Sequence, residues 1–449
     1  MAIYKETKDY KLIHDNMLNM GNYIEDGTID CVITDPPYEL GFMGKKWDGS
    51  GIAFNVDAWR KCFNALKDGG YLLAFGGTRT FHRIACAIED AGFEIRDTIM
   101  YLYAVGFPKS HNIGLAVDKL NGVESKVIAE GKSGSADTHT RTMKSITDNG
   151  KDVFGGNYEI KQAQNEWQGW GTALKPAYEP IIVARKPMKT SVAENVLKNR
   201  VGGINIDECR VGTEDISVHN APKGTFAGGE YDRGSDTESY REHTGRFPAN
   251  IVHDGSDEVV SGFPDTNSSN GSFSANDYKE GNGVTNFTRG DFEGYGDSGN
   301  ASRFFYTAKA SKKDRDEGLE AFDKIKVNDG RKTEIDNAFQ KGETPRKNIH
   351  PTVKPIELMQ YLVRLVAPKG ATILDCFMGS NSTGKAVMFE NRERNANYKF
   401  IGIELTDEYL PICEARIEYA INKYEYDEKL ERAKTGQLSI FDFVGEEDK

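Results

Sequence analysis

The chain has 449 residues with 57 basic and 69 acidic side chains, which gives a formal net charge of -12. This length fits two or three domains, or one large α/β domain with an insertion. No apolar run reaches the roughly 18–20 residues needed to span a bilayer. Six scattered cysteines without a C-x-x-C pair exclude a disulfide framework or zinc ribbon and favour a reducing cytoplasm. The acidic balance weighs against a nucleic-acid partner, since phosphate binding uses lysine and arginine.

Strand-like and helix-like patterns alternate over residues 1–188. The sequence predicts strands at 11–14, 30–34, 71–75, 94–105 and 179–185, and helices at 59–66 and 81–91. We expect the first helix to stop at Lys67–Gly70. Tyr71–Phe75 is a continuous apolar run of the kind found in parallel strands buried on both faces. This alternation predicts an α/β, doubly wound and mostly parallel sheet.

The composition changes twice further along the chain. Residues 189–301 are rich in Gly, Asn, Ser, Asp and Thr, which predicts a loop-rich insertion. The α/β pattern returns over 302–424, with helices expected at 356–366, 383–390 and 408–424 and strands at 371–374 and 400–403. Residues 425–449 form a charged tail. We therefore expect a sheet domain in two parts, 1–188 and 302–424, separated by the insertion.

The strongest motif is Asp35-Pro36-Pro37-Tyr38, directly after an apolar strand. A carboxylate at the end of a strand in an α/β sheet lies at the ligand-binding edge. The two prolines lack N–H donors and stiffen the turn, which leaves the Pro36 carbonyl free to accept. Tyr38 offers a flat face to a planar ring. The motif can therefore hold an exocyclic amine, such as adenine N6, between two acceptors.

A second motif follows the predicted strand 371–374. The run from Asp375 to Gly384, DCFMGSNSTG, reads as a tight Gly-rich turn that leads into a helix, where a cofactor can approach the backbone. It is not a phosphate-binding P-loop, because the Gly-Lys-Ser/Thr ending is absent. About 20 residues after the turn, Glu404 ends the next strand, a position at which an acid commonly binds ribose hydroxyls.

Together these motifs resemble the S-adenosylmethionine-dependent amino-methyltransferases of DNA. Their order, with Asp-Pro-Pro-Tyr first and the Gly-rich turn last, is similar to the circularly permuted β group. The resemblance also covers His350–Pro355, and two further segments, Leu174–Pro180 and Phe304–Lys309, are similar to segments of phage and bacterial members. The resemblance covers roughly residues 10–190 and 300–420. It implies a Rossmann-like methyltransferase sheet.

The resemblance also implies roles for individual residues. The catalytic group is Asp35, Pro36, Pro37 and Tyr38. The cofactor contacts are Asp15 on the cofactor adenine, Thr352 and Lys354 at its methionine end, and Asp375, Phe377, Gly379, Ser380, Asn381, Thr383 and Glu404. No metal is implied. Two positions depart from the family pattern: Cys376 replaces a proline, and Asn381 replaces a glycine, although asparagine tolerates a left-handed backbone better than most residues.

The expected chemistry is positioning. A base flipped out of DNA would present its amine to Asp35 and the Pro36 carbonyl for in-line attack on the activated methyl group. Family members with Asp at the first position mostly act on adenine N6, which favours adenine; cytosine N4 is the alternative. Methylation at cytosine C5 is disfavoured because no Pro-Cys pair occurs, and we interpret Glu194-Asn195-Val196 as helix surface. Protein glutamine methylation, whose family carries Asn before Pro-Pro-Tyr, and a non-catalytic DNA-binding relative are further alternatives.

Partners are predicted from local charge. Basic side chains at Arg303, Lys309, Lys312 and Lys313 are candidate phosphate contacts, and the insertion 189–301 is the candidate target-recognition region. Gln437–Phe441 resembles the short peptides that dock on bacterial sliding clamps. Residues 404–449 hold 13 acidic and 6 basic side chains, so more than half of the net charge lies in the last helix and tail. We therefore expect modest, salt-dependent DNA binding on one face.

Overall fold

The computed structural model describes residues 2–40, 46–104, 106, 110–132, 157–219, 240–267, 298–309, 311, 313–327 and 344–434. Two predictions lie outside these residues: the phosphate contact Lys312 and the clamp-docking peptide Gln437–Phe441. Among the described residues, no helix combines the length and apolar character that a membrane crossing requires.

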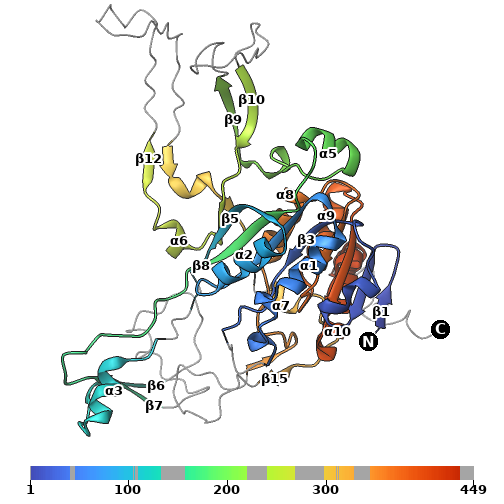
Figure 1. Cartoon of the computed structure of the whole chain (residues 1–449). Coiled ribbons are helices and arrows are strands. Elements are labelled where there is room, and N and C mark those ends of the chain that lie inside the picture. Colours follow the sequence, from blue (N-terminus) through green and yellow to red (C-terminus); the bar gives the residue numbers. More distant parts are fainter. Residues whose placement is uncertain are drawn as a thin grey trace, which may run out of the picture.

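A ten-stranded sheet organises the described part of the chain (Figure 1). Its strands, in spatial order, are β1 (Ala2–Glu6), β2 (Tyr10–His14), β18 (Lys399–Glu404), β17 (Thr372–Asp375), β3 (Ile29–Thr34), β4 (Leu66–Phe75), β8 (Tyr178–Arg185), β5 (Glu94–Leu102), β11 (Ile251–His253) and β14 (Tyr306–Thr307). Neighbouring strands are parallel except at the edge strand β1 and at β8, which runs antiparallel to both β4 and β5. The mostly parallel sheet is confirmed.

Helices cover both faces of this sheet, as a doubly wound fold requires. On one face pack α1 (Val56–Ala65) and α2 (Phe81–Asp90). On the other pack α8 (Ile356–Val366), α9 (Ser382–Arg394) and the first part of α10 (Leu410–Lys434). Successive residues of a strand point to opposite faces: in β3, Val32 belongs to the first core, whereas Cys31 and Ile33 belong to the second.

The circular permutation is visible in the strand order. The early strands β2 and β3 enclose the late strands β18 and β17, with β2 paired to β18 and β17 paired to β3. Segments from both ends of the chain therefore build one continuous sheet. The carboxyl ends of β3, β17 and β18 lie side by side at one edge.

Two local expectations are corrected by the structure. The helix does end before Lys67–Gly70, but this segment belongs to β4, where it forms a bulge: Ile29 lies opposite Leu66 while Cys31 lies opposite Tyr71. Asn195 is not helix surface. It is buried in α5 (Val192–Asn199), and its side-chain amide donates to the carbonyls of Asp68 and Val201 at 2.9 and 2.7 Å.

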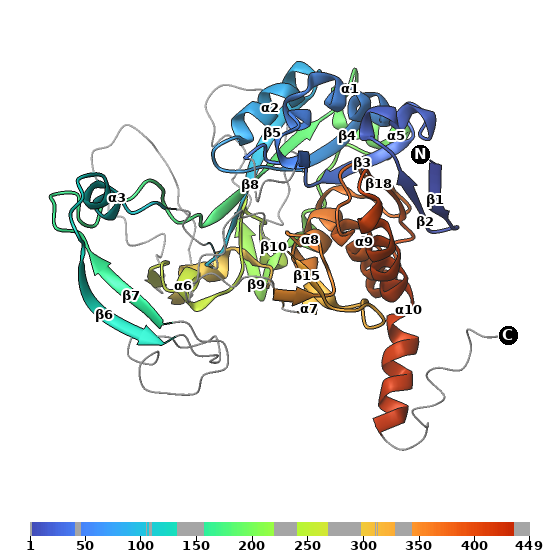
Figure 2. The same ribbon diagram turned by 90° about the horizontal axis from the view of Figure 1, so that it is seen from below.

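Several smaller elements lie outside the main sheet. Between β5 and β8, helix α3 (Ile113–Leu120) and the hairpin β6 (Lys126–Lys132)–β7 (Asn157–Gln162) project away from it (Figures 1 and 2). Residues 189–301 hold the hairpin β9 (Val211–His219)–β10 (Tyr240–Arg246), helix α6 (Asp257–Val260) and the pair β12 (Asp265–Asn267)–β13 (Ser298–Asn300). Helix α7 (Lys313–Asp316) and the pair β15 (Ile325–Val327)–β16 (Thr344–Arg346) follow. The segment 189–301 also supplies β11 to the central sheet.

Candidate active site

A cavity of about 1110 Å³ opens at the carboxyl ends of the central strands. In a parallel sheet this edge is where ligands bind. The cavity is lined by all four residues of the Asp-Pro-Pro-Tyr motif and by nine of the ten predicted cofactor contacts. These lining residues are Asp35, Pro36, Pro37, Tyr38, Asp15, Thr352, Lys354, Asp375, Phe377, Gly379, Ser380, Thr383 and Glu404. Both motifs therefore face one space.

Asp35 occupies the first position after β3, and its two carboxylate oxygens have different surroundings. Oδ2 lies 2.9 Å from the ammonium nitrogen of Lys354. Oδ1 is buried and has no hydrogen-bond partner among the described residues. A buried acceptor without a partner is costly, so this oxygen marks a place where an incoming N–H donor would be stabilised.

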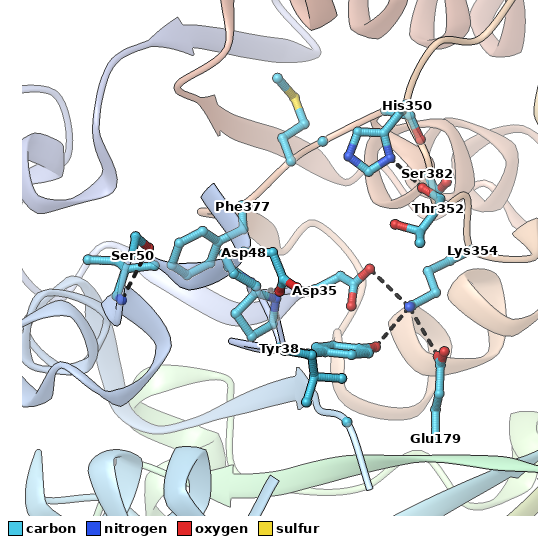
Figure 3. A pocket seen from close by; sticks show the side chains of 18 of the residues that line it. Asp35, Tyr38, Asp48, Ser50, Glu179, His350, Thr352, Lys354, Phe377 and Ser382 are labelled. Atoms are coloured by element: carbon cyan, nitrogen blue, oxygen red, sulfur yellow. Dashed lines mark hydrogen bonds and ion pairs between the residues drawn. The ribbon is translucent and has the colours of Figure 1, made fainter. Parts of the chain in front are cut away.

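The Lys354 ammonium lies between Asp35, Tyr38 and Glu179 in the cavity (Figure 3). It contacts Asp35, the Glu179 carboxylate at 3.0 Å and the Tyr38 hydroxyl at 2.9 Å. Burial by itself lowers the pKa of Lys354, but the two carboxylates outweigh burial and raise it above its ordinary value. The lysine is therefore firmly protonated.

Tyr38 is held through both its backbone and its side chain. The Thr80 hydroxyl donates to its carbonyl at 2.7 Å, and the Lys354 nitrogen lies 5.2 Å from its ring centroid. Burial raises the pKa of the Tyr38 hydroxyl well above its usual range, so the phenol stays neutral. Its ring is thus fixed beside Asp35, in the cavity where a planar base would enter.

The cofactor motif folds as the turn between β17 and α9. Gly379 and Asn381 both adopt left-handed backbone conformations, with φ of 55° and 59°. A Cβ at Gly379 would lie 2.9 Å from the His350 ring, so this glycine is sterically required. Asn381 caps α9 by accepting from the Gly384 amide at 3.0 Å and donates to the Cys413 carbonyl at 2.9 Å. The turn therefore survives the loss of the family's second glycine.

Asn381 itself does not line the cavity, and it supports the turn from behind. Cys376, the other departure from the family pattern, is buried with its sulfur 3.7 Å from the Cys62 sulfur and 3.7 Å from the Thr34 hydroxyl. Both departures thus fall on buried residues, of which Cys376 also lines the cavity.

Two carboxyl groups flank this turn at strand ends. Burial raises the pKa of Asp375 to about 6, although Thr34, Thr383 and the Phe377 amide all donate to it. Burial likewise raises the pKa of Glu404 to about 7. Glu404 accepts from the amides of Gly379 at 2.7 Å and Thr406 at 2.8 Å, which fixes its carboxylate beside the turn.

The remaining predicted cofactor contacts lie along the same cavity. Asp15, after β2, accepts from the Asn19 and Tyr23 side chains, both at 2.8 Å, and from the Asn16 amide at 2.7 Å. These hydrogen bonds, led by that of Asn19, lower the pKa of Asp15. The Thr352 carbonyl contacts the His350 ring, and burial lowers the pKa of His350 to about 4, so this imidazole is neutral at physiological pH.

The predicted phosphate contacts differ from one another in exposure. Lys309 and Lys313 are exposed. Arg303 is half-buried, and its guanidinium donates to the carbonyls of Gly299 and Asn300 and to the Thr266 hydroxyl at 3.0 Å. These bonds tie Arg303 to the β12–β13 pair. The contacts of Arg303 therefore stabilise the local structure.

Sequence reasoning missed one residue of the site. Glu179, in β8, reaches the cavity and binds Lys354, whereas the sequence predicts it only as part of the family-like segment 174–180. The available signal was an acidic residue at the start of an otherwise apolar strand. Among the described residues, no cluster of His, Cys, Asp and Glu could hold a metal ion.

The sequence of this chain is similar to those of known proteins. The family model N6_N4_Mtase, described as "DNA methylase", matches residues 29–415. The Type II methyltransferase M.HindIII of Haemophilus influenzae is 24% identical over 154 residues, 33% of this chain and 38% of that protein. The DNA adenine methyltransferase YhdJ of Escherichia coli is 36% identical over 92 residues, 20% of this chain and 29% of that protein. The aligned stretches thus span well under half of either relative.

The chain is also similar to solved structures of DNA methyltransferases. The cytosine-N4-specific PvuII DNA methyltransferase is 11% identical and aligns over 94% of this chain and 95% of its own, with a TM-score of 0.39. The M1.HpyAVI–SAM complex is 14% identical and aligns over 91% of this chain and 99% of its own, with a TM-score of 0.34.

Proposed function

Because this chain belongs to the N6/N4 family of DNA methylases, we propose that it transfers a methyl group from S-adenosylmethionine to the N6 amine of adenine in double-stranded DNA. The observation that carries the proposal is the buried Oδ1 of Asp35, which has no hydrogen-bond partner in the part of the chain that the structure describes. It lies in the same cavity as the cofactor turn and Tyr38. An exocyclic amine supplies the N–H donor that this oxygen lacks.

The cofactor half of the cavity fits S-adenosylmethionine. Glu404 is fixed at the end of β18, where a carboxylate can accept from ribose hydroxyls. Gly379 has no side chain, so a bound molecule can approach the backbone of the turn. When bound, the cofactor supplies a methyl group already activated by its sulfonium. Asp15, Asp375, Phe377, Ser380, Thr383 and Thr352 line the space that it would occupy.

The protein's own part in the reaction is orientation. Asp35 Oδ1 and the Pro36 carbonyl would accept the two amine hydrogens, which directs the nitrogen lone pair toward the methyl carbon. The bound cofactor would supply the methyl group, with the new N–C bond replacing the C–S bond and S-adenosylhomocysteine as the leaving group. Asp35 would stabilise the cationic amine, whose proton would pass through this carboxylate to solvent. Tyr38 would stack on the flipped base.

Adenine is favoured over cytosine by the aspartate at the first motif position and by the similarity to a DNA adenine methyltransferase. DNA would approach the cavity edge, with exposed Lys309 and Lys313 as phosphate contacts. The segment 189–301, from which β9 and β10 project (Figure 1), is the proposed target-recognition region.

The test is incubation of the purified protein with radiolabelled S-adenosylmethionine and unmethylated, amplified DNA of mixed sequence. Mass spectrometry of the digested nucleosides should detect N6-methyladenine, and Asp35→Ala should lower the rate by about a hundredfold or more while still binding cofactor. N4-methylcytosine alone would overturn the choice of base. No methylated base from the wild-type protein would overturn the activity itself.

A further inference from the structure

We propose that Lys354 and Glu179 are positioning residues for methyl transfer: Lys354 fixes the unreactive oxygen of Asp35 and the Tyr38 hydroxyl, and Glu179 neutralises the charge that Lys354 brings into the site. The inference rests on the proposed function, in which Asp35 receives the target amine. It gives Lys354 a role in the target-base half of the cavity, distinct from the cofactor contact that the resemblance implies.

The first support is the donor count at Lys354. An ammonium has three N–H donors, and three acceptors lie at hydrogen-bond distance: Asp35 at 2.9 Å, Tyr38 at 2.9 Å and Glu179 at 3.0 Å. The Lys354 side chain is only 10% exposed, so water cannot easily replace these partners. In this arrangement no N–H remains for a cofactor carboxylate.

The second support is the asymmetry that Lys354 creates in Asp35. Holding Oδ2 at 2.9 Å fixes the carboxylate plane and leaves Oδ1 buried without a partner. The same ammonium holds the Tyr38 hydroxyl. The acceptor for the amine and the stacking ring are therefore fixed by one cation, and small errors in such geometry cost large factors in rate.

The third support is the charge balance. The target amine becomes cationic as the methyl group arrives, and a nearby ammonium by itself would oppose this. Glu179 places a second carboxylate on Lys354, so the group formed by buried Lys354 and the half-buried Asp35 and Glu179 carries a net charge of one negative. The site therefore keeps a net negative charge, which favours both a sulfonium and an aminium cation.

Other ionisable groups face this cluster and must be considered in any pH experiment. Asp375 at the end of β17 and His350 before α8 interact electrostatically with Asp35, and Tyr103 after β5 interacts with Glu179 and Lys354. Tyr38 completes the set. None of these groups supplies a second cation that could replace Lys354 at Asp35, since His350 is neutral near pH 7.

The experiment compares Lys354→Met, Lys354→Arg, Glu179→Gln and the Lys354→Met/Glu179→Gln double variant with the wild-type chain. Lys354→Met should lower kcat by about tenfold or more, Lys354→Arg should restore part of it, and Glu179→Gln should lower kcat by about tenfold. The double variant should lose less than the product of the two single losses, because the residues act as a pair.

Matched controls separate this effect from general loss of stability. Lys186 is also largely buried and pairs with Asp68 at 3.6 Å, and Glu94 pairs with Arg185 at 2.8 Å, both away from the cavity. Lys186→Met and Glu94→Gln should leave kcat within about twofold of wild type. Thermal unfolding should confirm that each variant is folded, and if Lys354→Met is not, Lys354→Arg and Glu179→Gln decide the question.

The split between kcat and cofactor affinity is specific to positioning. In Lys354→Met the Kd for S-adenosylmethionine should stay within about twofold while kcat falls. An unchanged kcat, a loss confined to cofactor affinity, or single losses that simply multiply would each overturn the inference while leaving the proposed function intact. A wild-type chain without methyl transfer would overturn the proposed function instead.

Discussion

The Thr34 hydroxyl donates a hydrogen bond of 2.7 Å to the buried carboxylate of Asp375. Thr34 is the last residue of β3, directly before the Asp-Pro-Pro-Tyr motif, whereas Asp375 ends β17 and begins the cofactor turn. The same hydroxyl also accepts from the Phe377 amide at 3.2 Å. One side chain therefore couples the two motifs, although they are far apart in the sequence.

Thr34→Val should show how much this coupling contributes to the free energy of unfolding. Valine is similar in shape but removes both hydrogen bonds and leaves the Asp375 carboxylate with fewer donors. We expect the free energy of unfolding to fall by about 1–3 kcal/mol, measured by urea denaturation. Thr28→Val, which removes an exposed hydroxyl that donates to the Glu25 carbonyl, is the control and should change stability by less than about 0.5 kcal/mol. Equal effects of the two variants would contradict the prediction.

Cofactor binding should depend on pH through Glu404. Its pKa is raised to about 7 by burial, so the carboxylate that we propose as the acceptor for ribose hydroxyls is lost as the pH falls below about 7. The Kd for S-adenosylmethionine, measured by titration calorimetry between pH 6 and 8.5, should rise toward the acid end. Glu404→Gln should bind more weakly at pH 8.5 and show a flatter profile. A wild-type Kd independent of pH would contradict this role.

The contribution of Glu404 to the free energy of unfolding depends on pH in the opposite direction to its contribution to cofactor binding. Because its folded pKa lies above its ordinary value of 4.5, the folded chain holds this proton more tightly than the unfolded chain does. The contribution to the free energy of unfolding is therefore present below pH 4.5 and is lost as the pH rises through about 7. Glu404→Gln should lack this loss, so its stability relative to wild type should increase between pH 4.5 and 7.5 in parallel denaturant titrations.

Asn381 should tolerate glycine better than alanine. Its left-handed backbone costs alanine about 1 kcal/mol more than glycine, and both variants lose the cap on α9 and the bond to the Cys413 carbonyl. We expect Asn381→Ala to lower the free energy of unfolding by about 3 kcal/mol and Asn381→Gly by about 2 kcal/mol. Urea denaturation tests the order, and an alanine variant as stable as the glycine variant would contradict it.

Lys309 and Lys313 should contribute to DNA binding through phosphates. Each alanine variant should weaken binding similarly on any DNA sequence and lower the slope of log K against log salt by about 0.9. Fluorescence anisotropy at several salt concentrations measures this slope. The exposed Lys369, in the loop that leads into β17 at the edge opposite the cavity, is the matched control, and Lys369→Ala should not change the slope.

Local patterns were sufficient for much of the fold and for the positions of both motifs. Alternating apolar strands and helical spacings are short-range properties, so the strands before Asp35, Asp375 and Glu404 could be located from the sequence. The alternation of strands and helices predicted the mostly parallel sheet, and the family resemblance implied its permuted order. The left-handed turn at Asn381 was also foreseeable, because it depends on one residue's backbone preference.

The partners of individual side chains were decided only by the tertiary structure. Lys354 and Tyr38 are 316 residues apart, and nothing local in either segment encodes their contact or the approach of Glu179 from the reversed strand β8. The insertion was likewise expected to be loop-rich, yet it supplies β11 to the central sheet, and α3 with β6 and β7 leaves the sheet within a region assigned to the catalytic domain. Sequence periodicity thus determined which elements form and where the reactive groups follow them. Strand pairing over long separations determined which charges meet, because ionic contacts depend on distances in space and not on spacing along the chain.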